Sequence, residues 1–228
     1  MHYSLLIIDE NGCDVQELMK PYDENLFVHK SNPKGEWDWW QKGGRWSGQW
    51  LLKPKFVETA PAQPDQFLVG YAPVPEGRCD EAEKHQIDFT GHIEQIRQQL
   101  TEEWLTLDKA TRGLPKPVTF EELSALHPNM TDNSTIRQKY YQQPYCQAVF
   151  KAVDSEFFDV FCFVDVSMED YIQKRLYATA YPFYALLIGG EWIGCSDMES
   201  DELWGIRIRE AIENASDGAT LTVVDCHC

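Results

Sequence analysis

The feature that most constrains the fold of this chain is the order in which the spacing of its apolar residues changes. Short apolar runs typical of strands lie near both ends, over residues 2–9 and 219–228, and helical spacing occupies the middle. The last third mixes strand-like with helical segments. This order predicts an α+β fold, in which helices pack on a mixed or antiparallel sheet.

The clearest helical pattern runs from Asp88 to Asp108. Its apolar residues recur every three or four positions and so form one stripe: Phe89, Ile93, Ile96, Leu100, Trp104 and Leu107. Two further helices are expected over 117–128 and 131–144, where Pro128 and Pro144 mark the ends. The middle region is therefore predicted to be helical.

The chain shows no internal repeat and no low-complexity linker. We therefore predict a single α+β domain over 1–228, with a helical insertion over 81–145 as the alternative. The remaining pattern predicts strands over 25–30, 45–53, 66–74 and 157–166, a hairpin over 183–195, and helices over 167–177 and 201–217.

The charge of the chain bears on its partners. It carries 37 acidic and 20 basic side chains, a formal net charge of −17 at pH 7. Such a surface repels phosphates, which disfavours direct DNA binding and favours a basic or nucleic-acid-binding host protein as partner. The alternative is that the acidic surface keeps the chain soluble. Without a signal peptide or a membrane-spanning apolar run, we expect a cytoplasmic protein with no membrane contact, and a homo-oligomer is compatible with this.

Acidic residues are most concentrated between Asp154 and Glu202, where carboxylates far outnumber Lys174 and Arg175. If these carboxylates share one face, they could imitate a phosphate track and occupy a nucleic-acid-binding site. The alternative is a solvated face combined with helix caps, since several of them sit where helices are expected to begin.

The segment Asn32–Trp50 contains five of the eight tryptophans and is locally basic. Arg45 could grip a phosphate or carboxylate, Gly43 and Gly44 would let the backbone approach it, and an indole could stack on a base. The predicted binding residues are Trp37, Asp38, Trp39, Trp40, Gly43, Gly44, Arg45, Trp46 and Ser47, together with Asp225 and His227. The alternative is that the tryptophans form a hairpin core and that Arg45 pairs with Asp38 or Asp225.

The C-terminal residues Asp225, Cys226 and His227 raise the question of a metal or a nucleophile. They lack the second ligand pair that a zinc site needs, so no metal and no cofactor are predicted. A hydrogen bond between Asp225 and His227 is the favoured reading. A Cys–His–Asp arrangement with Cys195 or Cys226 is the alternative, and whether the chain is an enzyme stays open because it carries no known catalytic motif.

Three sequence stretches carry a resemblance. The run Asn32–Pro33–Lys34, the Trp37–Asp38–Trp39 and Gly43-to-Gly48 motifs, and the ending "LTVVDCHC" are similar to an uncharacterised family of phage and prophage proteins. The resemblance implies a mobile-element origin and an accessory role against a host process such as defence. No activity is established for that family, so it assigns no residue a role.

Two functions follow as hypotheses. The first is a phage or mobile-element accessory protein without catalytic activity, which binds and inhibits a host protein through its acidic surface. The second is an enzyme or sensor that binds a nucleotide-like small molecule at the tryptophan-rich segment, with Arg45 as the anion clamp.

Overall fold

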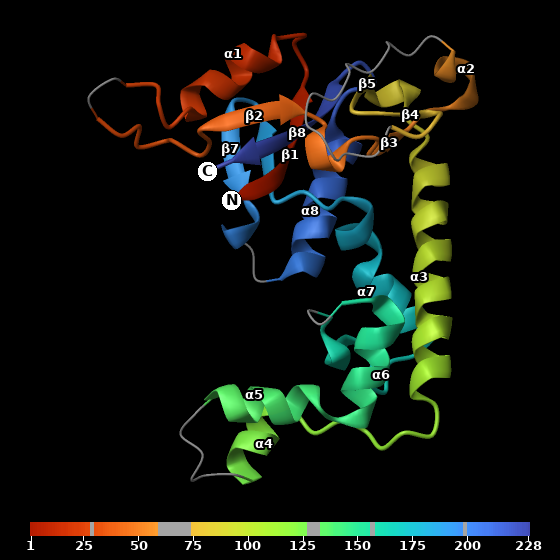
Figure 1. The fold of residues 1–228 in the computed structure, drawn as a ribbon. Coiled ribbons are helices and arrows are strands. Elements are labelled where there is room, and N and C mark those ends of the chain that lie inside the picture. Colours follow the sequence, from red (N-terminus) through yellow and green to blue (C-terminus); the bar gives the residue numbers. More distant parts are fainter. Residues whose placement is uncertain (28–29, 59–73, 127–132, 156–157, 198–199) are drawn as a thin grey trace. The chain divides into compact units, whose positions relative to one another are not determined.

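The computed structural model describes residues 1–27, 30–58, 74–126, 133–155, 158–197 and 200–228. It has the predicted α+β fold, with helices packed on a mixed sheet (Figure 1). The chain divides into two compact units, one formed by Met1–Gln95 with Tyr177–Cys228 and the other by Ile96–Leu176. The predicted insertion over 81–145 shares residues 96–145 with the second unit.

The first unit is built on a six-stranded sheet with the order β2–β8–β1–β6–β7, in which β5 also pairs with β8. The β1–β6 pair is parallel and the other pairs are antiparallel. The strands are β1 (His2–Asp9), β2 (Trp39–Lys42), β5 (Glu81–Glu83), β6 (Ala185–Ile188), β7 (Glu191–Gly194) and β8 (Thr220–His227), and a separate two-stranded sheet pairs β3 (Trp50–Leu51) with β4 (Arg78–Cys79).

The pairing register decides which side chains share a face, because alternate residues of a strand point to opposite faces. Leu5 pairs with Val224, and together they bury against Met19 of α1 (Val15–Met19). Leu6 pairs with Val223 on the opposite face. Helix α8 (Asp201–Asn214) covers that face, and α1 and α8 lie on opposite sides of the sheet in Figure 1. The inner strands are therefore apolar on both faces.

Helix α8 begins at a side-chain cap, where Ser200 accepts a hydrogen bond from the backbone N–H of Leu203. Its buried residues recur at helical spacing, at Trp204, Ile208 and Ile212. The indole N–H of Trp204 donates to the carbonyl of Phe183, which ties the helix to the start of β6.

The second unit is helical, as the spacing of its apolar residues predicts. It contains most of α3 (Phe89–Thr111) and α7 (Met168–Ala180), together with α4 (Phe120–Leu126), α5 (Asn133–Tyr141) and α6 (Pro144–Val153). Leu100 and Leu107 of the α3 stripe are fully buried. The Arg175 guanidinium binds the Glu103 carboxylate, and the Tyr171 hydroxyl donates to the same carboxylate.

Several predicted strands are wrong. Residues 25–27 form turns and bends, 158–166 contain a 3-10 helix at Val160–Cys162, and 45–49 lie in a 3-10 turn and the loop after it. Most of the strand expected over 66–74 lies outside the described residues. Helix α6 was missed: the sequence predicts that Pro144 ends a helix, whereas α5 ends at Tyr141 and Pro144 begins α6.

The remaining elements are short. They are the helix α2 (Pro54–Val57) and the 3-10 helices Lys20–Tyr22, Gly44–Trp46, Lys84–Gln86 and Cys195–Asp197. Among the described residues, no helix combines the length and the apolar composition needed to cross a bilayer.

Candidate functional site

The predicted glycine pair lies in a tight loop that folds back over one end of the sheet. We name residues 43–47 the GGRWS loop. Gly43 and Gly44 have φ values of 69° and 58°, as the sequence predicted for a turn. A Cβ atom on Gly44 would lie 2.5 Å from the Cβ of Asp225, so the backbone approaches this side chain more closely than any other residue would allow.

Two buried carboxylates hold the GGRWS loop. Asp225 is fully buried, and its Oδ2 accepts the backbone N–H of Arg45 at 3.2 Å. Asp80 accepts the Ser47 hydroxyl at 3.0 Å and the backbone N–H of Gly48 at 2.6 Å. Burial raises the pKa of Asp80 above its ordinary value. The loop therefore depends on carboxylates that come from β8 and from the turn between β4 and β5.

Asp225 also binds a histidine at the opposite end of the chain. Its Oδ1 lies 2.9 Å from Nδ1 of His2, and the two side chains are 0% and 20% exposed. The register explains the pairing: Ser4 lies opposite Asp225 and His2 opposite His227, so all four side chains share one face. Because the carboxylate accepts a hydrogen bond from Nδ1, this nitrogen of His2 carries a proton and Nε2 is the nitrogen that can contact a ligand.

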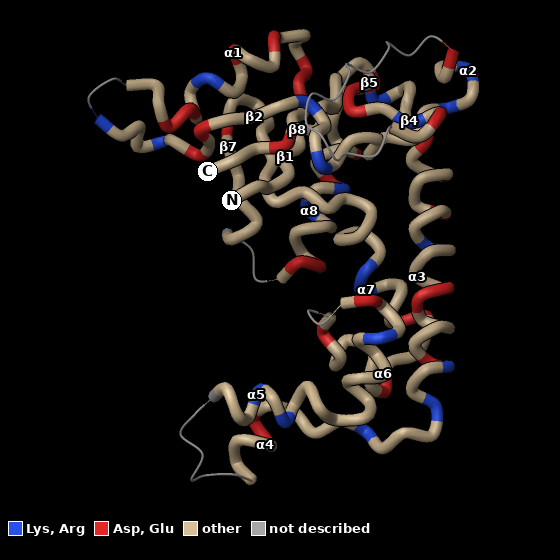
Figure 2. The backbone as a smooth tube through the Cα atoms, in the orientation of Figure 1, with Lys and Arg blue, Asp and Glu red and all other residues tan. Residues whose placement is uncertain are grey.

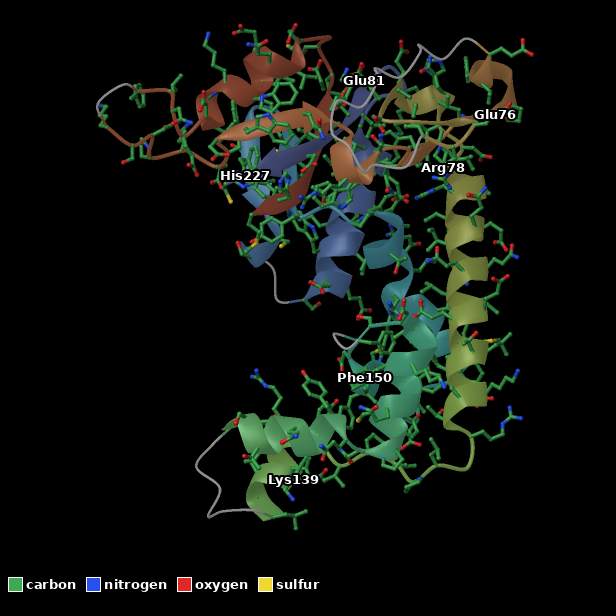
Figure 3. All side chains as sticks on the ribbon, in the orientation of Figure 1. Glu76, Arg78, Glu81, Lys139, Phe150 and His227 are labelled. Carbon is green, nitrogen blue, oxygen red and sulfur yellow. The ribbon has the colours of Figure 1, made fainter. Side chains whose placement is uncertain are left out.

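A second histidine–carboxylate pair lies beside the first. His227, labelled in Figure 3, has its Nδ1 2.8 Å from Oδ1 of Asp38. This hydrogen bond lowers the pKa of Asp38. The rings of His2 and His227 meet edge to face with centroids 4.9 Å apart. The predicted bond between Asp225 and His227 is therefore wrong: each of them binds a residue from another strand or loop.

In the described part of the chain, three surface cavities have His2 in their lining, and two of them lie beside the groups described above. The first, which we name the histidine cavity, has a volume of about 420 Å³ and is lined by His2, Asn25, Asp38, Trp39 and His227. The second, the aromatic cavity, has a volume of about 340 Å³. The aromatic residues that line it are Tyr3, Trp46, Tyr181, Phe183, Tyr184 and Trp204, and its lining also includes Ser4, Cys195 and Asp201. His2 lines both cavities, so its ring is shared between them.

The predicted tryptophan cluster divides into core and surface. Trp37 and Trp50 are buried, and the indole N–H of Trp37 donates to the carbonyl of Met19 at 3.1 Å, which is a structural role. Trp40 is half-buried and packs against Trp37. Trp39 is 40% exposed in the histidine cavity, and Trp46 is half-buried in the aromatic cavity. Arg45, which directly precedes Trp46 in the sequence, is exposed.

The two cysteines considered as nucleophiles, Cys195 and Cys226, also divide into one at a cavity and one in the core. Cys226 belongs to the core cluster under α1, on the face of the sheet opposite to Asp225, and burial raises the pKa of its thiol. It cannot serve as a nucleophile for His2. Cys195 lines the aromatic cavity together with His2. Within the part of the chain that the structure describes, no three His, Cys, Asp or Glu side chains gather in a group that could hold a metal ion.

The acidic stretch does not lie on one element. Asp154 to Asp170 belong to the second unit and Glu191 to Glu202 to the first, and acidic residues occur throughout both (Figure 2). Several lie at helix starts: Asp159 caps the 3-10 helix Val160–Cys162, Asp170 accepts the Ser167 hydroxyl at 2.7 Å, and Asp201 and Glu202 occupy the first turn of α8. Capping therefore accounts for part of this charge.

No family model, curated protein or solved structure matches the chain. What the site can do must be argued from its groups. A histidine oriented by a buried carboxylate can accept or donate a proton at Nε2. Of the rings of the aromatic cavity, the half-buried Trp46 and the exposed Tyr184 can stack on a flat ligand, whereas Tyr181, Phe183 and Trp204 are buried.

Several site residues were not predicted from the sequence, among them His2, Asp80 and Tyr181. His2 sits in a strand-like run that gives no sign of its partner, because Asp225 lies 223 residues away. Asp80 follows β4 in a segment without a motif. Only the folded structure, which joins segments distant in the sequence, identifies them.

Proposed function

We propose that the chain is an enzyme or sensor that binds a nucleotide-like small molecule at the end of the sheet where His2, the GGRWS loop and the two cavities meet. One observation carries the proposal: His2 is held by the fully buried Asp225 and lines both cavities. The aromatic rings and the Asp201 carboxylate of the aromatic cavity are groups that can contact a nucleobase.

The energetics of Asp225 support a functional reading. Removing a carboxylate from water costs several kcal/mol, and its hydrogen bonds offset this cost only in part. An apolar residue at position 225 would suit the inner strand β8 better, since its neighbours Val223 and Val224 are fully buried. A buried carboxylate that orients a partly exposed histidine at a cavity is a common arrangement in sites that transfer protons.

The aromatic cavity suits a nucleobase in size and lining. Its volume of about 340 Å³ falls in the range typical of small-molecule sites. Stacking of a base on an aromatic side chain contributes roughly 1–3 kcal/mol. Asp201, at the first turn of α8, is a carboxylate that can accept the exocyclic amino group of adenine, guanine or cytosine.

A thermal-shift screen against nucleosides, mononucleotides and dinucleotides tests the proposal. At least one of them should raise the melting temperature, and Trp46→Ala should weaken its binding by roughly tenfold or more, because a stacking contact is lost. The matched control is His85→Asn at an exposed histidine–carboxylate pair away from the cavities, which should leave affinity unchanged. If no nucleotide binds, the proposal fails.

A second candidate rests on a separate observation, the net charge of −17. In this reading the chain is a phage or mobile-element accessory protein that occupies a basic or nucleic-acid-binding host protein, as the sequence resemblance implies. Its affinity for that partner should fall steeply with added salt. Pull-downs from host lysate at low salt test it, and recovery of no stoichiometric partner contradicts it.

A further inference from the structure

Two imidazoles line the histidine cavity, and each of them is hydrogen-bonded to a carboxylate. His2 and His227 are each tied at Nδ1 to a carboxylate, at 2.9 Å and 2.8 Å. Their rings lie 4.9 Å apart between centroids, and both line one cavity. Each ring therefore has Nε2 as the nitrogen with which it can exchange a proton with a ligand. Two such nitrogens at one ligand can take up one proton and deliver another.

The two carboxylates differ in their surroundings, which assigns the two roles. Asp225 is 0% exposed and Asp38 is 39% exposed. A buried carboxylate interacts more strongly with a positive ring, because water screens it less. The ring that becomes positive during the reaction is therefore better placed beside Asp225, which makes His2 the base. His227, whose partner is in contact with water, is the acid.

The lining of the histidine cavity favours a small phosphodiester. Trp39 is 40% exposed, lies edge to face with His2 at 5.9 Å and can stack on a base, and Asn25 adds an amide. The net charge of −17 repels long polyanions. A dinucleotide, with one negative charge at its bridging phosphate, is repelled much less.

We propose that His2 and His227 form a general base and general acid pair that cleaves the phosphodiester bond of a short ribonucleotide. This rests on the nucleotide binding proposed above. His2 Nε2 takes the proton of the ribose 2′-hydroxyl while the 2′ oxygen bonds to phosphorus. The bond from phosphorus to the 5′ oxygen breaks, and protonated His227 gives its Nε2 proton to that oxygen. The products are a 2′,3′-cyclic phosphate and a 5′-hydroxyl, and proton exchange with water restores both rings.

The first test is cleavage of the 3′–5′ ribodinucleoside monophosphates, followed by chromatography. The full chain should yield a 2′,3′-cyclic phosphate, and the 2′-deoxy analogue should be inert because it has no internal nucleophile. The variants H2N and H227N should each lower kcat by roughly 10²- to 10⁴-fold. Asparagine can still donate to the carboxylate from its amide nitrogen, so the folded state is retained, and His85→Asn is the control with unchanged activity.

A substrate with a good leaving group separates the two roles. A ribonucleoside 3′-(4-nitrophenyl phosphate) releases 4-nitrophenolate, which needs no proton from the enzyme. H227N should therefore recover most of its activity on this substrate, whereas H2N should stay impaired because the 2′-hydroxyl still needs a base. Equal impairment of both variants on this substrate would overturn the assigned roles.

The outcomes distinguish this proposal from the one on which it rests. Binding of the 2′-deoxy dinucleotide, measured by quenching of tryptophan fluorescence, together with no cleavage of any ribodinucleotide, would overturn the cleavage proposal and leave nucleotide binding standing. If no nucleoside, mononucleotide or dinucleotide binds and no ribodinucleotide is cleaved, both proposals are overturned.

Discussion

Two physical effects make a side chain at Gly44 costly. Its φ of 58° is strained for any residue with a Cβ, and that Cβ would meet Asp225 at 2.5 Å. Gly189 has a similar φ of 60°, but nothing lies within 4 Å of the Cβ position. Comparing alanine substitutions at Gly44 and Gly189 therefore separates the energetic cost of backbone strain from that of steric contact.

We expect Gly189→Ala to lower the free energy of unfolding by about 1–2 kcal/mol, which is the cost of the left-handed conformation. Gly44→Ala should cost about 1–3 kcal/mol more, because Asp225 and the loop must shift. Urea unfolding of both variants measures the difference. Equal costs would mean that the GGRWS loop moves away from Asp225 freely.

Folding shifts the pKa values of Asp80 and Asp38 in opposite directions. Burial raises the pKa of Asp80 above its ordinary value of 3.8, so the folded state holds this proton to higher pH than the unfolded state does. The contribution of Asp80 to stability therefore increases as pH falls toward 3.8. The His227 hydrogen bond lowers the pKa of Asp38 below 3.8, so its contribution is present above that pH and is lost as pH falls through the folded value.

The variants Asp80→Asn and Asp38→Asn should show these opposite signs. From about pH 7 to about pH 4, the wild type should gain stability relative to Asp80→Asn, since only the wild type takes up the proton. Relative to Asp38→Asn, the wild type should lose stability once the pH falls below 3.8. Urea unfolding across this range measures both differences. The same sign for both would show that Asp80 is not desolvated.

At the scale of the elements, the crossing of α7 and α8 depends on Gly205. A Cβ there would lie 2.6 Å from the backbone nitrogen of Ala178 and 2.7 Å from the carbonyl carbon of Tyr177. Helix propensity alone predicts that Gly205→Ala stabilises α8 by about 1 kcal/mol. The contact opposes this, and overpacking against backbone atoms costs about 1–3 kcal/mol.

We therefore expect Gly205→Ala to lower the melting temperature. Gly218→Ala is the control, because nothing lies within 4 Å of its Cβ position, and it should leave the melting temperature unchanged or raise it slightly. A Gly205→Ala variant more stable than the wild type would contradict the close crossing of the two helices.

The elements also show what the sequence could and could not predict. The α3 stripe and the β6–β7 hairpin depend on neighbours in sequence, and both were predicted. Of the strand expected over 45–53, Trp50–Leu51 form β3, but the predicted alternation does not hold in the GGRWS loop. Its conformation is fixed by Asp80 and Asp225, which bind it from distant parts of the chain.

At the scale of the whole molecule, the candidate site is assembled from four distant segments: the start of β1, the loop around β2, the region from Tyr181 to Trp204, and the end of β8. The sequence identified the second and fourth through the tryptophan-rich segment and the Asp225–His227 ending. It could not identify His2, because the register that places it beside Asp225 and His227 is set by pairing across almost the entire chain.

All of these segments belong to the first compact unit, which predicts how the second unit affects binding. Leu107 is fully buried in the second unit, and Leu107→Ala should cost about 2–5 kcal/mol of stability through the cavity it leaves. Below the unfolding temperature, the variant should bind nucleotide with unchanged affinity. Trp46→Ala in the first unit should weaken nucleotide binding and have little effect on stability, because Trp46 is half-buried at a cavity wall. Calorimetric titration of both variants decides this, and a loss of affinity in Leu107→Ala would mean that the site depends on the helical unit.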